Sequence, residues 1–217
     1  MPDWDVYLVT GESLSAGRTT REIVVQAIEG GVGVVQLREK DRTVRERYET
    51  GREIRDPCRE NDVTFLVNDR VDLALALDAD GVHLGDDDLP VPAARELLGD
   101  GAIVGRSVST VAAAEDAERA GADYLGVGTV YRTGSKAEIP EETHGIGPER
   151  VAAIAAAVDV PVVGIGGITA DNAAAVAGAG ADGVAVITAI TRAEDPEAAT
   201  AALGDAVERG QSGRDDR

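Results

Sequence analysis

The sequence predicts a single (β/α)8 TIM barrel of the α/β class, and three observations support that prediction. Eight short apolar segments alternate with longer stretches of helical period along the 217 residues. These segments are rich in Val, Ile and Leu without polar alternation, as in parallel strands buried on both faces. The length suffices for one core and is slightly below the roughly 250 residues usual for such barrels. Eight repeats favour a closed barrel over an open doubly wound sheet, and no dinucleotide fingerprint follows the first strand.

The predicted strands and helices follow one another in regular order. The strands occupy residues 6–9, 33–37, 64–67, 81–84, 102–104, 124–127, 161–165 and 183–187. Two capping-box patterns, Thr19 with Glu22 and Thr43 with Glu46, predict the starts of the helices after the first and second strands. Pro196 occupies the first position of the last predicted helix, where proline is well tolerated.

Glycines mark the predicted helix ends and the end of the domain. The Gly-Gly pair at 30–31, Gly121 and Gly180 each precede a strand, where glycine supplies the left-handed conformation of a C-terminal cap. We expect the barrel to span residues 1–209. Residues 210–217 are polar and contain glycine, so we expect them to form a disordered tail.

The charge composition narrows the classes of partner. The chain has 21 Lys and Arg against 40 Asp and Glu, a net charge of −19, which argues against binding nucleic acid or an anionic membrane. Lysine occurs only at positions 40 and 136, and this acidic, lysine-poor composition suggests a salt-rich cytoplasm, as in a halophile. The single Cys58 excludes an intrachain disulfide and a cysteine-based metal cluster. No segment approaches the ~20 apolar residues of a membrane span, so we predict a cytoplasmic protein, with a homo-oligomer left open.

Residues just past the carboxyl ends of the strands carry the candidate chemistry, because that face holds the active site of such barrels. After the second strand, alternation places Gln36, Arg38 and Lys40 on one side. One amide and two cations suit phosphate oxygens, with arginine as a fork and lysine as a point charge. The alternative is a surface ion pair of Glu39 with Lys40.

Carboxylates follow the third and fourth strands. Asp69 and one of residues 86–88 could share a Mg2+ ion, which takes one or two carboxylates and completes its shell with phosphate oxygens. The alternative is that the aspartate run caps the next helix. Ser107, after the fifth strand, suits a ligand oxygen or equally a helix cap. His83 is interpreted as a structural residue of a strand, and His144 as a solvated one.

The remaining candidates follow the last three strands. Residues 129–147 contain glycine, hydroxyls and Lys136 without clear periodicity, which predicts a functional lid over the mouth. The glycine pair Gly166-Gly167 and the turn at Thr188 expose backbone N–H groups at helix N-termini, a typical phosphate site of these barrels. Together with the cations, these turns imply two anionic subsites on opposite sides of the mouth.

The ordered set of segments, from Tyr7-Leu8-Val9-Thr10 to Ile187-Thr188-Ala189-Ile190, resembles the thiamine-phosphate synthase family. The resemblance implies a transferase that condenses 4-amino-2-methyl-5-hydroxymethylpyrimidine diphosphate with 4-methyl-5-(2-phosphoethyl)thiazole, giving thiamine phosphate and diphosphate. It also implies Mg2+ as the cofactor and a dissociative reaction. Diphosphate leaves the methylene carbon of the pyrimidine, and the thiazole nitrogen captures the ring-stabilised cation, so neither a nucleophile nor a general base is required.

The resemblance also assigns roles to residues. It implies that the pyrimidine diphosphate is held by Gln36, Arg38, Lys40, Asn68, Ser107 and Lys136. It implies that Asp69 and Asp88 bind Mg2+. It implies that the thiazole phosphate is held by Thr133 and Ser135 and by the backbone of Gly166, Gly167, Ile187 and Thr188. Of these residues, Arg38, Lys40 and Lys136 are the expected catalytic cations.

The sequence departs from the family pattern at several positions. The family usually has a glutamine at Asp86, an apolar residue at Arg106, prolines at Thr129 and Arg132, and a threonine at Ser135. Ser135 keeps the hydroxyl, whereas Thr129 and Arg132 change the expected shape of the loop.

Two other functions compete with this interpretation. A thiazole tautomerase of the same superfamily shares the barrel and the thiazole-phosphate site, but it has a histidine where this chain has Thr129. A non-catalytic phosphate-binding barrel that senses thiamine precursors is a different class. The presence of Lys40, Asp69, Asp88 and Lys136 favours the synthase.

Overall fold

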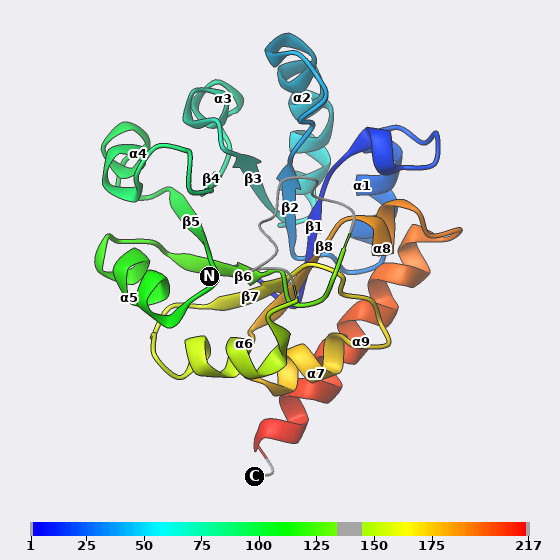
Figure 1. Cartoon of the computed structure of the whole chain (residues 1–217). Coiled ribbons are helices and arrows are strands. Elements are labelled where there is room, and N and C mark those ends of the chain that lie inside the picture. The colour runs from blue at the N-terminus through cyan, green and yellow to red at the C-terminus, as the bar shows by residue number, and fades with distance from the viewer. Residues whose placement is uncertain (1, 134–144, 216–217) are drawn as a thin grey trace.

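The computed structural model describes residues 2–133 and 145–215 and shows a closed barrel of parallel strands wrapped by helices (Figure 1). The strands are β1 (Val6–Val9), β2 (Val34–Leu37), β3 (Thr64–Asn68), β4 (Gly81–Leu84), β5 (Ile103–Val108), β6 (Tyr124–Gly128), β7 (Val162–Ile165) and β8 (Gly183–Val186). The helices are η1 (Glu12–Leu14), α1 (Thr20–Glu29), α2 (Val44–Glu60), α3 (Val71–Leu77), α4 (Val91–Leu98), α5 (Val111–Arg119), α6 (Gly147–Ala155), α7 (Ala173–Gly178), α8 (Thr188–Thr191) and α9 (Pro196–Asp215). The strands lie in chain order, and β1 closes the barrel on β8, so the predicted (β/α)8 barrel is confirmed.

Most predicted strand limits agree with the observed ones within one residue, and β5 is the exception. A strand was predicted at 102–104, whereas β5 continues to Val108. Residues 105–108 pair with the first part of β6, with Gly105 opposite Tyr124. Only glycine fits at this position, because a Cβ there would lie 2.2 Å from the Tyr124 ring. Ser107, which was expected after the end of this strand, therefore belongs to it.

The predicted helix caps are present. Thr19 accepts a hydrogen bond from the N–H of Glu22, whose carboxylate accepts from the Thr19 N–H, and Thr43 and Glu46 form the same box. Helix α9 begins at Pro196, as predicted. The helix-exit glycines have left-handed φ values of 87° at Gly31, 90° at Gly121 and 110° at Gly180.

The strands face two separate cores. Their outward side chains pack under the helices, and their inward side chains fill the barrel. The inner cluster consists of Trp4, Tyr7, Val9, Val34, Leu66, Tyr124, Val163, Ala185 and Ile187. The Trp4 ring packs on that of Tyr124, with 4.4 Å between the centroids, and in the described part of the chain its indole nitrogen has no hydrogen-bond partner. These aromatic rings form the floor on which the polar residues of the barrel mouth lie.

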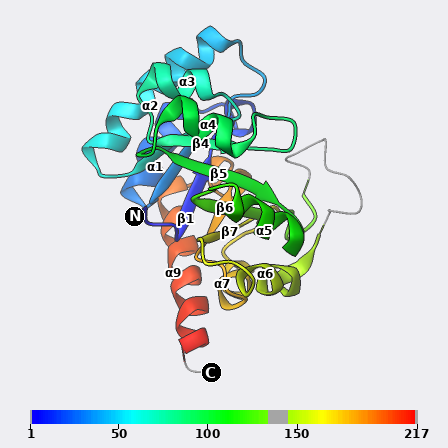
Figure 2. The same cartoon turned by 90° about the vertical axis from the view of Figure 1, so that its left-hand side faces the viewer.

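Helix α9 continues past Gly210 to Asp215, where a disordered tail was expected (Figure 2). Gly210 allows close packing on α7, because a Cβ at this position would lie 2.4 Å from the carbonyl oxygen of Ala174. The amide of Gln211 donates to the carboxylate of Asp5, at 3.0 Å, and to a backbone carbonyl at 3.1 Å. The polar composition suggested disorder, but these tertiary contacts order the helix.

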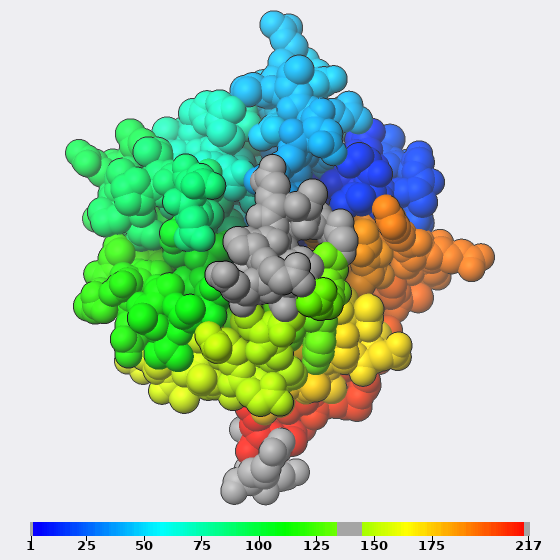
Figure 3. Space-filling view, in the orientation of Figure 1, coloured from blue at the N-terminus to red at the C-terminus, as the bar shows by residue number. Residues whose placement is uncertain are grey.

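The loop after β1 and the segment after β8 meet at the barrel mouth. The Arg18 guanidinium donates to the carbonyls of Thr191, at 3.3 Å, and Ala193, at 2.5 Å, beyond β8. The Thr191 hydroxyl donates back to the carbonyl of Leu14 at 2.9 Å. In the space-filling view, the first segment of the chain, in blue, lies beside the segment after β8, in orange (Figure 3). None of the helices in the described ranges is long and apolar enough to cross a membrane.

Candidate active site

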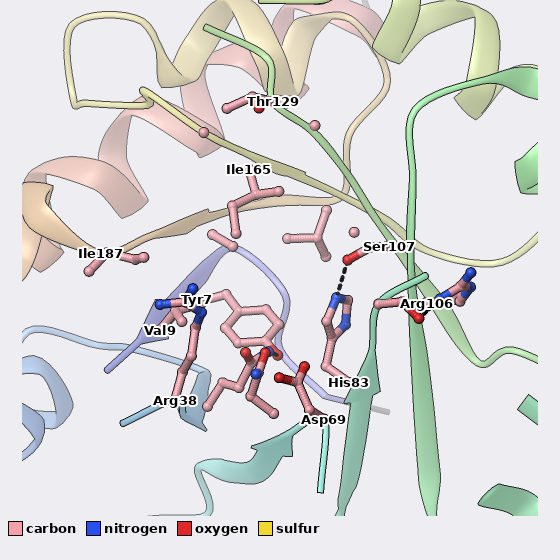
Figure 4. Close-up of a pocket in the computed structure, with 18 of the residues that line it drawn as sticks. Tyr7, Val9, Arg38, Asp69, His83, Arg106, Ser107, Thr129, Ile165 and Ile187 are labelled. Carbon is pink, nitrogen blue, oxygen red and sulfur yellow. Dashed lines mark hydrogen bonds between the residues drawn. The ribbon is translucent and has the colours of Figure 1, made fainter. Parts of the chain in front are cut away.

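A cavity of about 1280 Å³ opens at the carboxyl ends of the strands. All the described residues expected to bind substrate or metal line this cavity: Gln36, Arg38, Lys40, Asn68, Asp69, Asp88, Ser107, Thr133, Gly166, Gly167, Ile187 and Thr188. Ser135, Lys136 and His144 lie outside the described residues. Arg38, Asp69 and His83 converge from one side of the barrel, with Thr129 and Ile165 across from them (Figure 4). The structure therefore gathers in one place residues that are far apart in the sequence.

Lys40 pairs with a carboxylate from the next strand rather than with its neighbour Glu39. Its Nζ lies 3.2 Å from Oδ2 of Asp69. Glu39 is only 3% exposed and points the other way, accepting hydrogen bonds from the N–H of Glu12, at 2.9 Å, and the hydroxyl of Thr20, at 2.8 Å. The alternative Glu39–Lys40 ion pair is therefore wrong. The buried glutamate anchors the β1 loop, and the lysine is left at the cavity.

Asp69 and Asp88 bring two carboxylates together between β3 and β4. Asp69 has a left-handed φ of 63°, and its N–H donates to the carbonyl of His83 at 2.8 Å. Burial raises the pKa of the Asp88 carboxyl above its usual range, and the adjacent Asp69 carboxylate raises it further, while the Gly85 N–H and the Lys40 ammonium lower it. Two like charges held this close are stabilised by a cation between them.

Two of the departures from the family pattern turn out to be partners. The Arg106 guanidinium lies 2.7 Å from the Asp86 carboxylate and also donates to the carbonyl of Gly85. The N–H of Gly85 in turn donates to Oδ2 of Asp88 at 2.6 Å. Arg106 therefore fastens the same turn that orients Asp88. Asp86 itself is 89% exposed and directed at the arginine.

The opposite side of the cavity is built from the glycine turn after β7. Gly166 and Gly167 have left-handed φ values of 105° and 63°. The amide of Asn172 donates to the Gly167 carbonyl at 3.1 Å and accepts from the N–H of Thr169 at 2.9 Å, which fixes the turn. Asn172 was not among the residues expected from the sequence. Its position, a few residues past a Gly-Gly pair, is the signal that could have identified it. The short helix α8 follows directly after β8, where these barrels often bind phosphate.

The ends of the loop between β6 and α6 are fixed against this glycine turn. The N–H of Val130 donates to the carbonyl of Ile165, at 2.9 Å, and that of Tyr131 to the carbonyl of Gly166, also at 2.9 Å. Thr129 is buried, and its carbonyl accepts from the N–H groups of Gly145, at 3.0 Å, and the following residue, at 2.9 Å. The threonine at a position where the family usually has proline therefore lies in a backbone closely bonded on both sides.

A buried polar chain, which sequence analysis did not predict, crosses the barrel under the cavity. The Gln36 amide donates to the Tyr7 hydroxyl at 2.5 Å, and this hydroxyl lies 2.9 Å from that of Tyr124. Nδ1 of His83 lies 2.7 Å from the Tyr124 hydroxyl, and its Nε2 lies 2.9 Å from Oγ of Ser107 (Figure 4). His83 is thus hydrogen-bonded at both ring nitrogens, as its interpretation as a structural residue required. The chain links two of the expected substrate-binding residues.

The arrangement has the chemistry of a polyanion site with two halves. On the β2–β4 side, Arg38 and Lys40 offer positive charge beside the carboxylates of Asp69 and Asp88. Across the cavity, the backbone turn of Gly166 and Gly167 suits a phosphate group. Within the described residues, no three His, Cys, Asp or Glu side chains gather to bind a metal alone. A divalent ion here would therefore need ligand oxygens as well as the aspartates.

The chain is similar to known proteins over nearly all of its length. Residues 6–190 match the family model described as thiamine monophosphate synthase. The chain is 70% identical over 211 residues to a thiamine-phosphate synthase of Haloarcula marismortui, covering 97% of this chain and 100% of the relative. It is 63% identical to one of Natronomonas pharaonis, covering 95% and 96%. A solved thiamine phosphate pyrophosphorylase from Pyrococcus furiosus superposes with a TM-score of 0.87 at 42% identity, covering 96% and 98%.

Proposed function

The chain belongs to the thiamine monophosphate synthase family, and we propose that its barrel-mouth cavity is where the pyrimidine and thiazole halves of thiamine are joined. The reaction condenses the pyrimidine diphosphate with the thiazole phosphate and releases diphosphate. The observation that supports this site best is its two-sided construction, with cations and carboxylates on β2–β4 and a glycine turn after β7. The pyrimidine half loses its diphosphate and the thiazole half keeps its phosphate. Each side of the cavity suits one of these two anionic groups.

The pyrimidine diphosphate binds, in this proposal, on the side of β2 to β5. Arg38 and Lys40 contact the diphosphate oxygens, with Gln36, Asn68 and Ser107 against the rest of the molecule. The ion pair of Lys40 with Asp69 supports this placement, because it holds the ammonium group at the cavity, beside one of the two carboxylates. Lys136, which follows β6 in the sequence, is assigned to the same group of cations from the family pattern.

The residues present fit a Mg2+ site. Asp69 and Asp88 face each other, and burial and mutual repulsion raise the pKa of Asp88, as expected of a carboxylate pair built to share a cation. Mg2+ typically takes one or two carboxylates and completes its shell with water and substrate phosphates. When bound, Mg2+ neutralises charge that develops on the departing diphosphate. Arg106 holds the Gly85 turn and thereby the direction of Asp88.

The thiazole phosphate binds on the opposite side. The N–H groups of the Gly166-Gly167 turn and of the start of α8, at Ile187 and Thr188, contact the phosphate, as does the Thr133 hydroxyl. Ser135 is assigned to the same subsite from the family pattern. The hydrogen bond from the Asn172 amide supports this assignment, because it engages the Gly167 carbonyl and fixes the turn.

The chain's own residues then promote a dissociative reaction. Arg38, Lys40 and Lys136 stabilise the negative charge on the leaving diphosphate, which lowers the barrier to breaking the bond from the methylene carbon to oxygen. The thiazole nitrogen, oriented by its anchored phosphate, captures the resulting pyrimidine cation. No residue has to remove a proton, which agrees with both nitrogens of His83 being engaged by neighbouring hydroxyl groups.

The direct test is the coupling assay in molar KCl and in dilute buffer, with and without Mg2+, with thiazole tautomerisation measured in parallel. Formation of thiamine phosphate that depends on Mg2+ supports the proposal. No product under any condition would overturn it, and tautomerisation alone would assign the rival function. Lys40→Met should lower turnover by about 100-fold. The control is Arg59→Met, an exposed cation on α2 that pairs with Asp78 away from the cavity and should leave activity unchanged.

We propose that the enzyme works in a salt-rich cytoplasm on these two small substrates. The net charge of −19 supports this, as does the similarity to relatives from Haloarcula and Natronomonas. A surface so rich in carboxylates repels itself at low ionic strength, and salt screens the repulsion. The local cations of the cavity are what allow polyanionic substrates to bind despite the overall charge.

A further inference from the structure

The buried chain under the cavity crosses the barrel through side chains from five different strands. Gln36 of β2, Tyr7 of β1, Tyr124 of β6, His83 of β4 and Ser107 of β5 follow one another at hydrogen-bond distances of 2.5, 2.9, 2.7 and 2.9 Å. All five residues line the cavity, and Gln36 and Ser107 are the two ends of the chain of hydrogen bonds. The middle members, Tyr7 and Tyr124, are almost fully buried.

Counting protons gives the hydrogen bonds of this chain one direction from donor to acceptor. The amide N–H of Gln36 donates to the Tyr7 oxygen, and among the described residues the Tyr124 hydroxyl is the acceptor within reach of the buried Tyr7 proton, so this proton is assigned to Tyr124. Tyr124 then has its own proton for His83, whose Nδ1 must accept it. A neutral imidazole that accepts at Nδ1 carries its proton on Nε2, and this proton is donated to Ser107. The Ser107 oxygen is thus an acceptor toward His83, and its own proton points elsewhere.

We propose that Tyr7, Tyr124 and His83 are positioning residues that make Ser107 a hydrogen-bond donor to the pyrimidine diphosphate. This inference rests on the proposed function for its ligand, but the proton arrangement exists in the free enzyme. With the opposite direction, Ser107 would donate to His83 and could only accept from a ligand. An acceptor-only hydroxyl repels phosphate oxygens and unprotonated ring nitrogens, so the direction decides whether the subsite binds.

Burial keeps both tyrosines of the hydrogen-bond chain protonated. Burial raises the pKa of both Tyr7 and Tyr124 above the ordinary range of a phenol. Neither hydroxyl therefore loses its proton near neutral pH. What remains is the direction of the hydrogen bonds, and the direction that starts at the Gln36 amide is the one that gives each buried tyrosine proton an acceptor.

The test is the tautomer of His83, measured by 15N NMR on protein labelled at histidine, without substrate. The protein has two histidines, so His144→Gln assigns both sets of resonances. We expect an unprotonated Nδ1 and a protonated Nε2 in His83. Gln36→Glu places an acceptor where the donor was, so at pH 8 it should reverse the chain and put a proton on Nδ1. In the Tyr7→Phe background, which interrupts the chain, Gln36→Glu should leave the His83 resonances unchanged.

A protonated Nδ1 in the wild-type enzyme would overturn the proposal, whatever the variants do. So would a Gln36→Glu protein with native circular dichroism and an unchanged His83. Because the measurement needs no turnover, it stays informative even if the coupling assay fails. A failed coupling assay with the expected His83 tautomer would overturn the proposed function and still establish the direction of the hydrogen bonds.

Kinetics provide the second readout. Tyr7→Phe removes one buried oxygen and should raise the KM for the pyrimidine diphosphate roughly two- to ten-fold, the range for one hydrogen bond, with the KM for the thiazole phosphate unchanged. Tyr48→Phe, on the outer helix α2, is the matched control and should change neither constant. Equal changes in both constants, or no change in either, would contradict a role through Ser107.

Discussion

Replacing Gly166 by alanine separates two costs in the turn after β7. The residue has a φ of 105°, and an added Cβ would lie 1.8 Å from Cγ2 of Thr129 and 2.8 Å from its Cβ. Gly121, with a φ of 90°, has no heavy atom within 4 Å of the same point. Both alanines suffer the left-handed penalty of about 1 kcal/mol. Only Gly166→Ala adds an overlap, which typically costs another ~1–3 kcal/mol.

We therefore expect Gly121→Ala to lower the free energy of unfolding by about 1 kcal/mol and Gly166→Ala by about 2–4 kcal/mol. Urea unfolding followed by circular dichroism in molar KCl measures both. Gly166→Ala should also raise the KM for the thiazole phosphate, because relief of the overlap displaces the turn, whereas Gly121→Ala should not. Equal losses of stability in the two variants would refute the reasoning from the overlap with Thr129.

Four further outcomes follow from the structure and the sequence. Lys136→Ala should lower kcat by about 100-fold with unchanged circular dichroism, and full activity would remove this lysine from the site. Asp88→Asn should raise the Mg2+ concentration for half-maximal activity, and the Kd for Mn2+ measured by EPR, by about ten-fold; an unchanged Kd would argue against the metal site. Burial, with Asp80 nearby, raises the pKa of the Cys58 thiol from 9.0 to about 12, so a thiol reagent at pH 8 should react only after unfolding. The stability linked to this group is complete below pH 9 and is lost between pH 9 and about 12, and rapid labelling of the native protein would contradict the burial. Thr43→Ala should cost about 1 kcal/mol in urea unfolding, and no loss would show that the α2 capping box contributes little.

Local signals in the sequence were sufficient for the fold. A capping box involves residues three positions apart, so Thr43 and Glu46 could be paired directly from the printed order. The end of β5 could not be located in this way, because Gly105 is a strand residue only on account of the Tyr124 ring packed on it. Likewise, the order of α9 beyond Gly210 depends on α7, which no local pattern indicates.

The candidate site also has features that the sequence predicts and features that it does not. Arg38 and Lys40 could be proposed from strand alternation, and the glycine turn from its composition. The partners of these residues could not be identified, because Lys40 pairs with Asp69 and Tyr7 with Tyr124, the second pair 117 positions apart. The direction of the buried Glu39 was equally hidden, since an acidic residue next to a lysine suggests an ion pair until the packing of the β1 loop is known.

The packing of Trp4 on Tyr124 has a practical consequence for studying ligands. Trp4 is the only tryptophan in the chain, and its ring lies against the tyrosine that joins Tyr7 to His83. Its fluorescence therefore arises from a single place under the site and needs no added label. Titrating either substrate while following this emission would give a dissociation constant directly in concentrated salt.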